Sequence, residues 1–404
     1  MSTFENPDIL IIGGGVVGIA IGVALLESKP GLKVLISEKE QTLGEHASGR
    51  NSGVIHAGFY YSPDSLKAKF CRIGNSELRE LCKKYSIPLR ETGKVVVTAN
   101  PNENTRLETL FARGVVNGVD LELLDESKLI KIEPLAKTFG RFLWSPTTAI
   151  SDPKMVLEVL KVKFMKLGGK FRYGIELNLL LENGNISLDS IGINPKYIVN
   201  AAGAQADKIA KQIGLAKEYA MIPFIGVYRA TSEKYLPLKT LVYPVPHPVN
   251  PFLGVHFTLT LDNKVKIGPT AIPIIGREQY SLFSGISFDD LKETTKGVLA
   301  LIRGGSHDFS EIIKSEWPKL FENLLVRQSL NLVPSAIEVR NWQKKPPGIR
   351  SQLVNLSNGK LEEDFIVRNF LNSTHILNAV SPGWTSALPF GRWVAENYIL
   401  PNLN

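Results

Sequence analysis

The sequence predicts an α/β protein with two parts: a Rossmann-like nucleotide-binding domain, and a discontinuous second domain of the α+β kind whose sheet is mainly antiparallel. Two observations near the N-terminus predict the first part. The apolar run Ile9–Ile12 is typical of a buried parallel strand, and the motif Gly13-x-Gly15-x-x-Gly18 leads from it into an Ala- and Leu-rich helix. The second part follows from alternating apolar and polar residues farther along the chain.

Each glycine of this motif has its own physical reason. Gly13 allows a tight turn, Gly15 lets a pyrophosphate approach the backbone, and Gly18 lets the helix pack closely on the strand. The helix N-terminus then faces the anion. A second apolar run ends at Glu38, 20 residues after Gly18, where a dinucleotide-binding unit places the partner of a ribose hydroxyl. The competing interpretations are a plain strand–turn–helix unit and a membrane span, and the glycine content disfavours the span.

Length and composition are typical of a soluble globular protein, because 404 residues with 44% hydrophobic and 21% charged side chains can bury a large core. Cys71 and Cys82 are the only cysteines, which predicts a reducing compartment and buried core thiols on one helix face. The first residues, Met1–Pro7, lack the basic region of a signal peptide, so we expect a cytoplasmic protein. No His/Cys cluster has metal-site spacing, so we expect no metal.

The net charge of +8 suits an acidic substrate or an anionic membrane surface, such as the inner face of the membrane, and a solvated basic surface explains it as well. Any contact with a membrane would be peripheral, because no segment after the Gly-rich helix has the pattern of a span. We find no basic stripe interleaved with aromatic residues, so we expect no nucleic-acid partner.

A loop rich in Gly, Ser, His and Asn is expected at residues 42–62. Its small residues let the backbone approach a ligand, and Arg50, Asn51 and Ser52 can donate hydrogen bonds to a phosphate or to ring carbonyls. The alternative is a polar surface loop, but the position directly after a nucleotide-binding unit favours a binding function. The Ser62-Pro-Asp-Ser segment then caps a helix that we expect to reach residue 85.

The middle of the chain alternates between the two predicted domains. Residues 89–140 begin the second domain, and residues 141–220 complete the sheet of the first. Asp152-Pro153 starts a helix with a cap and a proline in its first turn, and Gly168-Gly169 stops it. The other expected elements are a strand at 92–98, a helix at 102–117, a strand end with a capped turn at 122–129, a hairpin over 170–188 around Glu182-Asn-Gly-Asn, and a buried strand at 197–200.

Strands dominate again from residue 221 to about residue 334, which we assign to the second domain. The segment 253–261 alternates cleanly, so His256 shares a face with two threonines. This polar face either lines a substrate cavity or faces water, and the pattern alone does not decide between them. The other expected elements are a strand at 224–231, a Pro-rich loop at 243–251, a hairpin partner at 264–267 and helices within 288–321.

The chain returns to the first domain from residue 335. Residues 340–350 are basic and Pro-rich, and they are either a solvated linker or a cationic ledge in which Arg350 binds a carboxylate. Gly383 opens a last helix whose amides can point at a developing anion. Strands are expected at 365–367 and 374–378, and the domain ranges are 1–88, 141–220 and 335–404 for the nucleotide-binding domain, and 89–140 and 221–334 for the second domain.

Together and in this order, these motifs resemble the FAD-dependent oxidoreductases of the D-amino-acid-oxidase superfamily. The resemblance covers nearly the whole chain. It rests on the start motif, the loop at 46–61, Asn200-Ala-Ala-Gly203, Gly348-Ile-Arg350 and the helix opened by Ser381-Pro-Gly383.

Five further strings are similar to one branch of this superfamily, the L-2-hydroxyglutarate oxidases and dehydrogenases. They are His56-Ala-Gly-Phe-Tyr-Tyr-Ser-Pro-Asp-Ser-Leu-Lys67, Phe252-Leu-Gly-Val-His256-Phe-Thr258, Gly268-Pro269, Arg277-Glu278 and Gly348-Ile-Arg-Ser-Gln-Leu353. The chain departs from the pattern of that branch at Thr270, Ser351, Val380 and Gly383-Trp384. Trp384 beside the flavin can change the size of the substrate or the access of the acceptor.

The resemblance implies a Rossmann-like FAD-binding domain that holds FAD non-covalently, a substrate domain, and oxidation of L-2-hydroxyglutarate to 2-oxoglutarate by hydride transfer from C2 to flavin N5. The electrons then pass to oxygen or to a quinone or carrier. The amides around Gly383 are expected to stabilise negative charge on the reduced flavin. The cofactor-binding residues expected on this basis and from the motifs are Gly13, Gly15, Val17, Gly18, Glu38, Lys39, His46, Arg50, Asn51, Ser52, Gly53, Ala201, Gly203, Gly383, Trp384 and Thr385.

A dianionic 2-hydroxy acid needs a base for its hydroxyl proton and cations for its two carboxylates. His256 is our first candidate for the base, since the ordinary pKa of histidine lies near neutral pH, and His56 is the alternative. The candidate partners of the carboxylates are Arg350 for C1 and Arg277, with Tyr60 or Tyr61, for the distal end.

Two other functions stay open. A related flavin oxidoreductase that acts on an amino acid or on glycerol 3-phosphate would share the fold, although an amine substrate favours an acidic or hydroxyl partner over histidine. A basic protein that holds FAD without turnover would keep its yellow colour with every substrate, and the density of polar residues in the flavin-side loops disfavours it.

Overall fold

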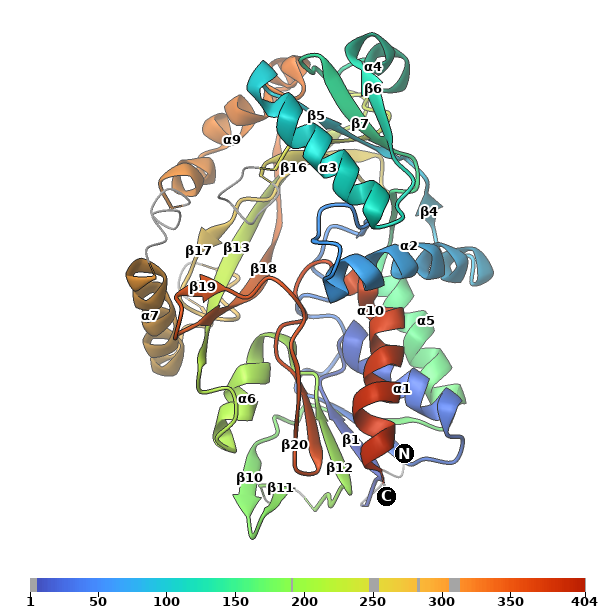
Figure 1. Cartoon of the computed structure of the whole chain (residues 1–404), viewed down its shortest axis with the longest axis vertical. Helices are drawn as coiled ribbons and strands as arrows, with labels where there is room; N and C mark the ends of the chain where they lie inside the picture. Colours follow the sequence, from blue (N-terminus) through green and yellow to red (C-terminus); the bar gives the residue numbers. More distant parts are fainter. Residues whose placement is uncertain (1–5, 190–191, 247–253, 282–283, 305–312, 404) are drawn as a thin grey trace.

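The computed structural model describes residues 6–189, 192–246, 254–281, 284–304 and 313–403, and it contains two large sheets (Figure 1). The first has six strands in the order β20-β21-β12-β1-β2-β9, and its edge strand β20 is antiparallel to its neighbour whereas the others run parallel. Its strands are β1 (Ile9–Ile12), β2 (Val34–Glu38), β9 (Lys170–Tyr173), β12 (Tyr197–Asn200), β20 (Val367–Phe370) and β21 (Ser373–Ile376).

The strand β1 lies at the centre of this sheet with all four of its apolar side chains buried. Ile9 and Ile11 belong to the apolar core on the side of the helices, and the alternate pair packs into a smaller core on the opposite face. The helix layer consists of α1 (Val16–Ser28), α5 (Pro153–Lys166) and α10 (Gly383–Val394) (Figure 1). Among the described residues, no helix has the length and apolar character needed to cross a bilayer.

The second sheet is mainly antiparallel and follows the order β19-β18-β13-β16-β15-β14-β5-β7-β6, with β17 paired to β13. The α/β fold class with an antiparallel second sheet is therefore confirmed. The strands of this sheet are β5 (Lys94–Val97), β6 (Glu122–Asp125), β7 (Arg141–Ser145), β13 (Tyr219–Ser232), β14 (Leu241–Pro244), β15 (His256–Leu259), β16 (Lys264–Gly268), β17 (Ile272–Pro273), β18 (Gln343–Asn355) and β19 (Lys360–Leu361).

Smaller elements complete the fold. A three-stranded sheet and a hairpin lie beside the two large sheets, and several helices cover the second sheet (Figure 1). The strands are β3 (Val54–Ile55), β4 (Leu89–Arg90), β8 (Ala149–Ser151), β10 (Leu179–Glu182) and β11 (Asn185–Leu188). The helices are α2 (Leu66–Lys84), α3 (Asn104–Val116), α4 (Glu126–Ile132), α6 (Ala206–Gln212), α7 (Phe288–Arg303) and α9 (Glu322–Ser329), with short 3-10 turns at Pro101–Glu103, Gly203–Gln205, Trp317–Leu320, Pro334–Glu338 and Leu400–Asn402, and a π-turn at Ala395–Ile399.

The helix α2 begins as predicted, because the Ser65 hydroxyl accepts a hydrogen bond from the Ala68 amide at 3.1 Å. Cys71 and Cys82 are both buried and unbridged on this helix, so the prediction of core thiols is confirmed. Burial raises the pKa of Cys71 to about 12, which keeps the thiol protonated.

Two sequence predictions about local structure are wrong, and one alternative is excluded. Residues 170–173 were expected in the hairpin, but they form β9 and pair with β2, so the hairpin is limited to β10 and β11. Tyr243 and Pro244 lie in β14 and not in a loop, and residues 247–251 of the expected Pro-rich loop lie outside the described residues. Of the two alternatives for residues 340–350, the solvated linker is excluded for residues 343–350, because they belong to β18 and pair with β13.

The observed strand pairing differs from the predicted domain ranges at two places. Residues 141–145 and 343–361 were expected in the FAD-binding part, but β7, β18 and β19 pair within the second sheet. The chain therefore stays in the second sheet longer than predicted at both places, through β7 and through β19. The expected helices within 288–321 are present as α7 and a 3-10 turn, and residues 305–312 lie outside the described part.

The buried histidine of the parallel sheet predicts an acid-dependent loss of stability. His375 on β21 is fully buried between Asn200 and Ser373, and burial lowers its pKa to about 4 from an ordinary value of 6.5. Between these two values the unfolded chain binds a proton that the folded chain does not, so the free energy of unfolding falls as the pH falls.

We expect this residue to account for a loss of about 2 kcal/mol between roughly pH 7.5 and pH 5. Urea unfolding of the wild type and of His375→Asn, followed by tryptophan fluorescence at both pH values, measures the loss. The variant should be less stable at the higher pH but lose about 2 kcal/mol less on acidification. Equal losses in the two proteins would contradict the assignment.

Candidate active site

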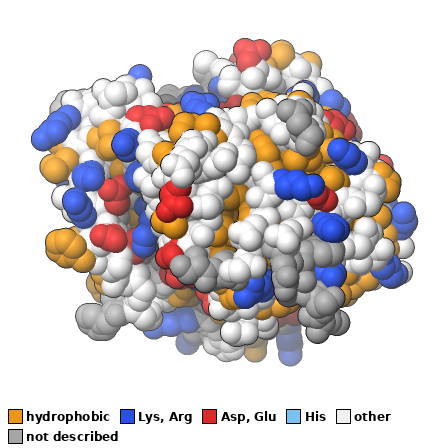
Figure 2. All heavy atoms as spheres, turned by 90° about the horizontal axis from the view of Figure 1, so that it is seen from below, with side chains coloured by type: hydrophobic (Ala, Val, Ile, Leu, Met, Phe, Trp, Pro, Cys, Tyr) orange, Lys and Arg blue, Asp and Glu red, His pale blue; other side chains and the backbone are white. Residues whose placement is uncertain are grey.

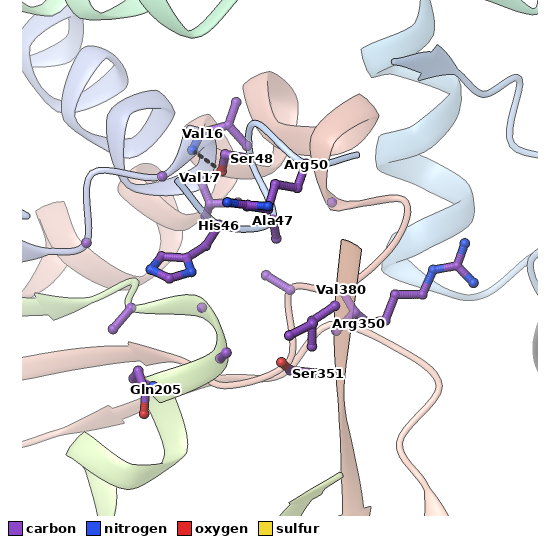
Figure 3. A pocket seen from close by; sticks show the side chains of 18 of the residues that line it. Val16, Val17, His46, Ala47, Ser48, Arg50, Gln205, Arg350, Ser351 and Val380 are labelled. Carbon is purple, nitrogen blue, oxygen red and sulfur yellow. Dashed lines mark hydrogen bonds between the residues drawn. The ribbon is translucent and has the colours of Figure 1, made fainter. Parts of the chain in front are cut away.

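A cavity of about 320 Å³ lies between the ends of the parallel strands β1 and β12 and the second sheet. Its wall combines the turn after β1, the loop at 44–56, the start of α10 and side chains of β13, β14, β15 and β18 (Figure 3). Of the residues predicted to bind the cofactor, those that line it are Gly13, Gly15, Val17, Glu38, Lys39, His46, Arg50, Asn51, Ser52, Ala201, Gly203, Gly383, Trp384 and Thr385.

The start of α1 forms an open cradle. A Cβ atom built on Gly15 would meet only the Ser48 hydroxyl, at 3.1 Å, so the space in front of this residue is free of protein atoms. The Ser48 hydroxyl accepts a hydrogen bond from the Val16 amide at 3.0 Å, which fixes the loop against the helix N-terminus (Figure 3). Ser48 was not among the predicted residues, although it lies within the small-residue loop that the sequence singled out.

Two glycines outside this cradle serve packing. A Cβ on Gly18 would lie 2.1 Å from the carbonyl oxygen of Gly13, so Gly18 permits the close contact of helix and strand and does not line the cavity. Gly53 also lies outside the cavity lining. Its φ is +75°, and a Cβ there would come within 2.4 Å of the Ser151 carbonyl oxygen.

The acidic end of β2 is held by backbone amides. The Glu38 carboxylate accepts hydrogen bonds from the Gly14 amide at 2.9 Å and the Glu40 amide at 3.0 Å, at the edge of the cavity. Arg50 stacks over the ring of Tyr280 at 4.2 Å and donates to the Glu45 carbonyl. Asn51 caps its own loop, because its side-chain oxygen accepts from the Gly53 amide.

A polar cluster that the sequence did not predict lies beside this edge. The carboxylates of Glu40 and Glu278 and the imidazole of His46 place ligand atoms within 4.8 Å of one another. Lys39 donates to both carboxylates, and its hydrogen bond keeps the pKa of Glu40 below the ordinary value. The Tyr280 hydroxyl is 3.1 Å from His46 Nδ1. The negative charge of the cluster is thus compensated by a lysine of the protein.

His256 lies on the cavity wall, where its ring stacks on Tyr243 with the centroids 3.8 Å apart. Its Nδ1 is 2.8 Å from the Gly254 carbonyl oxygen, which can only accept, so Nδ1 carries the proton and the lone pair is on Nε2. The side chain is buried, and burial lowers the pKa of His256 to about 3. The polar face of β15 therefore lines a cavity and does not face water.

His56 is the second histidine of the cavity. Its Nδ1 is buried without a hydrogen-bond partner among the described residues, and burial lowers its pKa well below the ordinary value. Its backbone amide donates to the Thr385 hydroxyl at 3.2 Å, which in turn donates to the Val54 carbonyl. The contact ties His56 to the start of α10.

Arg350 comes from β18, opposite Phe224 of β13, and lines the cavity with Gly348 and Ser351 of the same strand (Figure 3). Tyr228 of β13 also lines the cavity, and its hydroxyl is hydrogen-bonded to Arg350. The expected position of Arg350 at the cavity is thus observed, while its strand was not foreseen.

The structure argues against the substrate role that the sequence suggested for Arg277. Arg277 lines the cavity, but its guanidinium is buried and paired with the carboxylates of Asp207 and Asp290, and it donates to the Ala204 carbonyl. Two protein carboxylates compensate its charge, so no free charge remains for a substrate. Tyr60 and Tyr61 do not line the cavity: the Tyr60 hydroxyl is buried without a partner among the described residues, and Tyr61 bonds to Ser381.

Lys94 was missed because it lies in a plain Lys-Val-Val-Val strand. It is 1% exposed, and its ammonium is 4.5 Å from the ring centroids of Phe59 and Tyr60 and 4.8 Å from that of Tyr243. Burial lowers the pKa of Lys94 to about 7. No sequence pattern marks such a lysine, since its burial depends on strands and loops far away in the chain.

Comparisons with known proteins agree on one family. The sequence profile of the FAD dependent oxidoreductases matches residues 8–397. The mitochondrial L-2-hydroxyglutarate dehydrogenase of Caenorhabditis elegans is 36% identical over 409 residues, which cover 97% of this chain and 93% of that protein. The L-2-hydroxyglutarate dehydrogenase of Indibacter alkaliphilus is 36% identical over 400 residues, covering 96% of this chain and 98% of its own.

A solved structure shares the fold over nearly the whole length. The dithionite-reduced L-α-glycerophosphate oxidase of Mycoplasma pneumoniae with FAD bound has a TM-score of 0.74 and 24% identity, and the match covers 98% of this chain and 96% of the other. At 24% identity, the similarity shows a shared fold and no more.

The residues of the cavity fit a flavin dinucleotide. The space in front of Gly15 is open for a pyrophosphate, and a Cβ built on Gly383 would meet no atom within 4 Å. At the start of α10, the Trp384 indole nitrogen is buried without a partner among the described residues. An extended ligand with a central pyrophosphate and a polar ring system at one end offers partners to these groups.

Two glycine variants distinguish a glycine that makes room for the cofactor from a glycine that lets the strand and the helix pack closely. Gly15 has a φ of −71°, which alanine adopts freely, so Gly15→Ala should fold while its methyl group occupies the pyrophosphate space. We expect FAD affinity to fall about tenfold or more, equivalent to about 1.4 kcal/mol. Fluorescence titration of the deflavinated protein with FAD measures it.

Gly18→Ala is the matched control, because its methyl group would press on the Gly13 carbonyl and not on the ligand. We expect this variant to lower the free energy of unfolding by about 1–3 kcal/mol. An unchanged FAD affinity in the Gly15→Ala protein would contradict the cradle.

Proposed function

The chain belongs to the family of FAD-dependent oxidoreductases, and we propose that it oxidises L-2-hydroxyglutarate to 2-oxoglutarate with non-covalently bound FAD. The observation that carries the proposal is the chemistry of the cavity: a neutral histidine on β15 and an arginine on β18 of the same sheet line it, together with the dinucleotide cradle. Full-length relatives with the name L-2-hydroxyglutarate dehydrogenase support the choice of substrate over an amino acid or glycerol 3-phosphate.

The cofactor would be held at two points by helix starts, at its central pyrophosphate and at its flavin ring. Gly15 and the first amides of α1 would receive the pyrophosphate, Glu38 a ribose hydroxyl, and the amides of Gly383 and Thr385 the ring end. When bound, FAD accepts the hydrogen of C2 as a hydride with its two electrons. The remaining task of the protein is to bind the acid, orient C2 and take one proton.

His256 is proposed as the base that takes the hydroxyl proton at Nε2. The hydrogen bond from Nδ1 to the Gly254 carbonyl fixes the tautomer that leaves this lone pair available. In the cavity without substrate, burial keeps the imidazole neutral. A dianion beside it favours the protonated form and so raises its pKa toward the working range. His56, with its unpartnered Nδ1, remains the alternative base.

Arg350 is proposed to bind the C1 carboxylate. A planar guanidinium can hold a carboxylate through two parallel hydrogen bonds, which also fixes the plane of the acid group and therefore the direction of the C2 hydrogen. Its hydrogen bond to Tyr228 holds the guanidinium toward the cavity. The substrate is thus bound between β15 and β18, with the dinucleotide cradle on the opposite side.

The proposal includes an electron acceptor, either oxygen or a quinone or carrier, and peripheral contact with a membrane if the acceptor is a quinone. Basic side chains are scattered over the face shown in Figure 2 and interspersed with acidic ones. The rate of re-oxidation in air, compared with the rate in the presence of a soluble quinone, distinguishes the two acceptors.

The first test of the proposal is an anaerobic titration that follows the visible spectrum of the flavin. We expect L-2-hydroxyglutarate to bleach the oxidised spectrum stoichiometrically, while D-2-hydroxyglutarate leaves it unchanged because its C2 hydrogen points away when both carboxylates are bound. Glycine, L-proline and glycerol 3-phosphate serve as comparisons. Bleaching by one of these and not by L-2-hydroxyglutarate would overturn the proposed substrate.

Two histidine variants assign the base. We expect His256→Asn to keep FAD but to slow anaerobic flavin reduction at saturating substrate by about 100-fold or more, since an amide cannot accept the proton. His56→Asn, a change of the same kind in the same cavity, should cost less. Stopped-flow reduction measures both. If the His56 variant shows the larger loss, the roles of the two histidines are exchanged.

A further inference from the structure

Lys94 is a buried cation for which the protein supplies no anion. Among the described residues, its ammonium makes no hydrogen bond or ion pair, and the groups around it are the rings of Phe59, Tyr60 and Tyr243 at 4.5–4.8 Å. Aromatic faces attract a cation, but they replace only part of its lost hydration. A lysine in this position would cost the protein stability unless a ligand uses its charge.

Two other buried cations of the chain are paired with acids. Arg277 is paired with Asp207 and Asp290, and Lys319 is paired with Glu316. These two cations have carboxylate partners supplied by the fold. Lys94 is as buried as they are, but its ammonium faces aromatic rings and lies near the Cys71 thiol. No carboxylate among the described residues is paired with its charge.

Lys94 is connected to the cavity through one shared ring. Tyr243 lines the cavity, its ring lies 4.8 Å from the Lys94 ammonium, and the same ring stacks on His256 at 3.8 Å. The flexible four-carbon stem of a lysine lets the ammonium reach past the edge of such a ring. The Tyr60 hydroxyl, buried without a hydrogen-bond partner among the described residues, lies in the same aromatic group.

We propose that Lys94, with the hydroxyl of Tyr60, binds the distal carboxylate of the substrate, so that it sets the preference for a dicarboxylate over a monocarboxylate 2-hydroxy acid. The inference rests on the proposed function and replaces the role first expected of Arg277. It gives the dianion one cation at each end: Arg350 on β18 for C1 and Lys94 on β5 for the far end. Both unpaired groups, the ammonium and the phenol, then gain a partner.

The test compares two substrates that differ only at the far end. L-2-Hydroxypentanoate has a methyl group where L-2-hydroxyglutarate has the distal carboxylate. Anaerobic stopped-flow reduction of the FAD-loaded protein gives the apparent Kd and the limiting rate for each. The wild type should bind the dicarboxylate about 100-fold more tightly, as expected for a buried charge pair.

In Lys94→Met, which keeps the length of the side chain, we expect the Kd for L-2-hydroxyglutarate to rise about 100-fold and the Kd for L-2-hydroxypentanoate to stay nearly unchanged. Lys67→Met is the matched control: Lys67 is a buried lysine of α2 whose ammonium lies over the ring of Phe365, and its loss should leave the ratio of the two Kd values intact. If Lys94→Met does not fold, Lys94→Gln allows the same comparison.

Three results would overturn the inference. They are equal affinity of the wild type for the two acids, a Lys94 variant that weakens both acids alike, and a Lys94 variant whose limiting rate falls while its Kd values stay the same, which would make Lys94 a proton acceptor. Failure of the proposed function looks different, because the flavin of the wild type would then not be reduced by L-2-hydroxyglutarate at all.

Discussion

The long antiparallel ladder between β13 and β18 is the interaction on which the site depends. It runs from Tyr219 opposite Asn355 to Ala230 opposite Gln343, with an irregularity after Gly226. The ladder crosses the middle of the molecule (Figure 1) and sets Arg350 and Tyr228 at the cavity. It also meets the cofactor side directly, because a Cβ on Gly348 would lie 2.8 Å from the Arg50 carbonyl oxygen. One pair of strands therefore fixes the distance between the substrate groups and the dinucleotide loop.

The electrostatics of the cavity follow from this enclosed position. Burial lowers the pKa of His256 to about 3 and of Lys94 to about 7, so without substrate the imidazole is neutral and the ammonium is only partly protonated near neutral pH. A bound dianion raises both pKa values, since each of its carboxylates favours the protonated form of a neighbouring base. Binding of the acid and the capacity of the histidine to accept a proton are thus coupled in the account proposed here, without any movement of the backbone.

The sequence predicted those features that depend on residues close together in the chain. The spacing of Gly13, Gly15 and Gly18 reflects contacts within a single strand–turn–helix unit, and the alternation around His256 marks one face of one strand. Resemblance to known sequences added the order of the motifs. The pairing of Arg277 with Asp207, 70 positions away, and the burial of Lys94 against the distant Tyr243 could not be predicted, because only the folded sheets bring these residues together. The pairing of residues 170–173 with β2 was not predicted for the same reason.

The central claim is that the cavity is built for two negative charges. Its most direct test uses the wild-type protein with FAD and two unreactive acids, glutarate and pentanoate, which differ in one carboxylate. The shift of the flavin absorption bands reports their binding. The account predicts that glutarate binds about 100-fold more tightly than pentanoate. Equal binding of the two acids, or tighter binding of pentanoate, would show that the cavity recognises a single carboxylate and an apolar tail, and would contradict it.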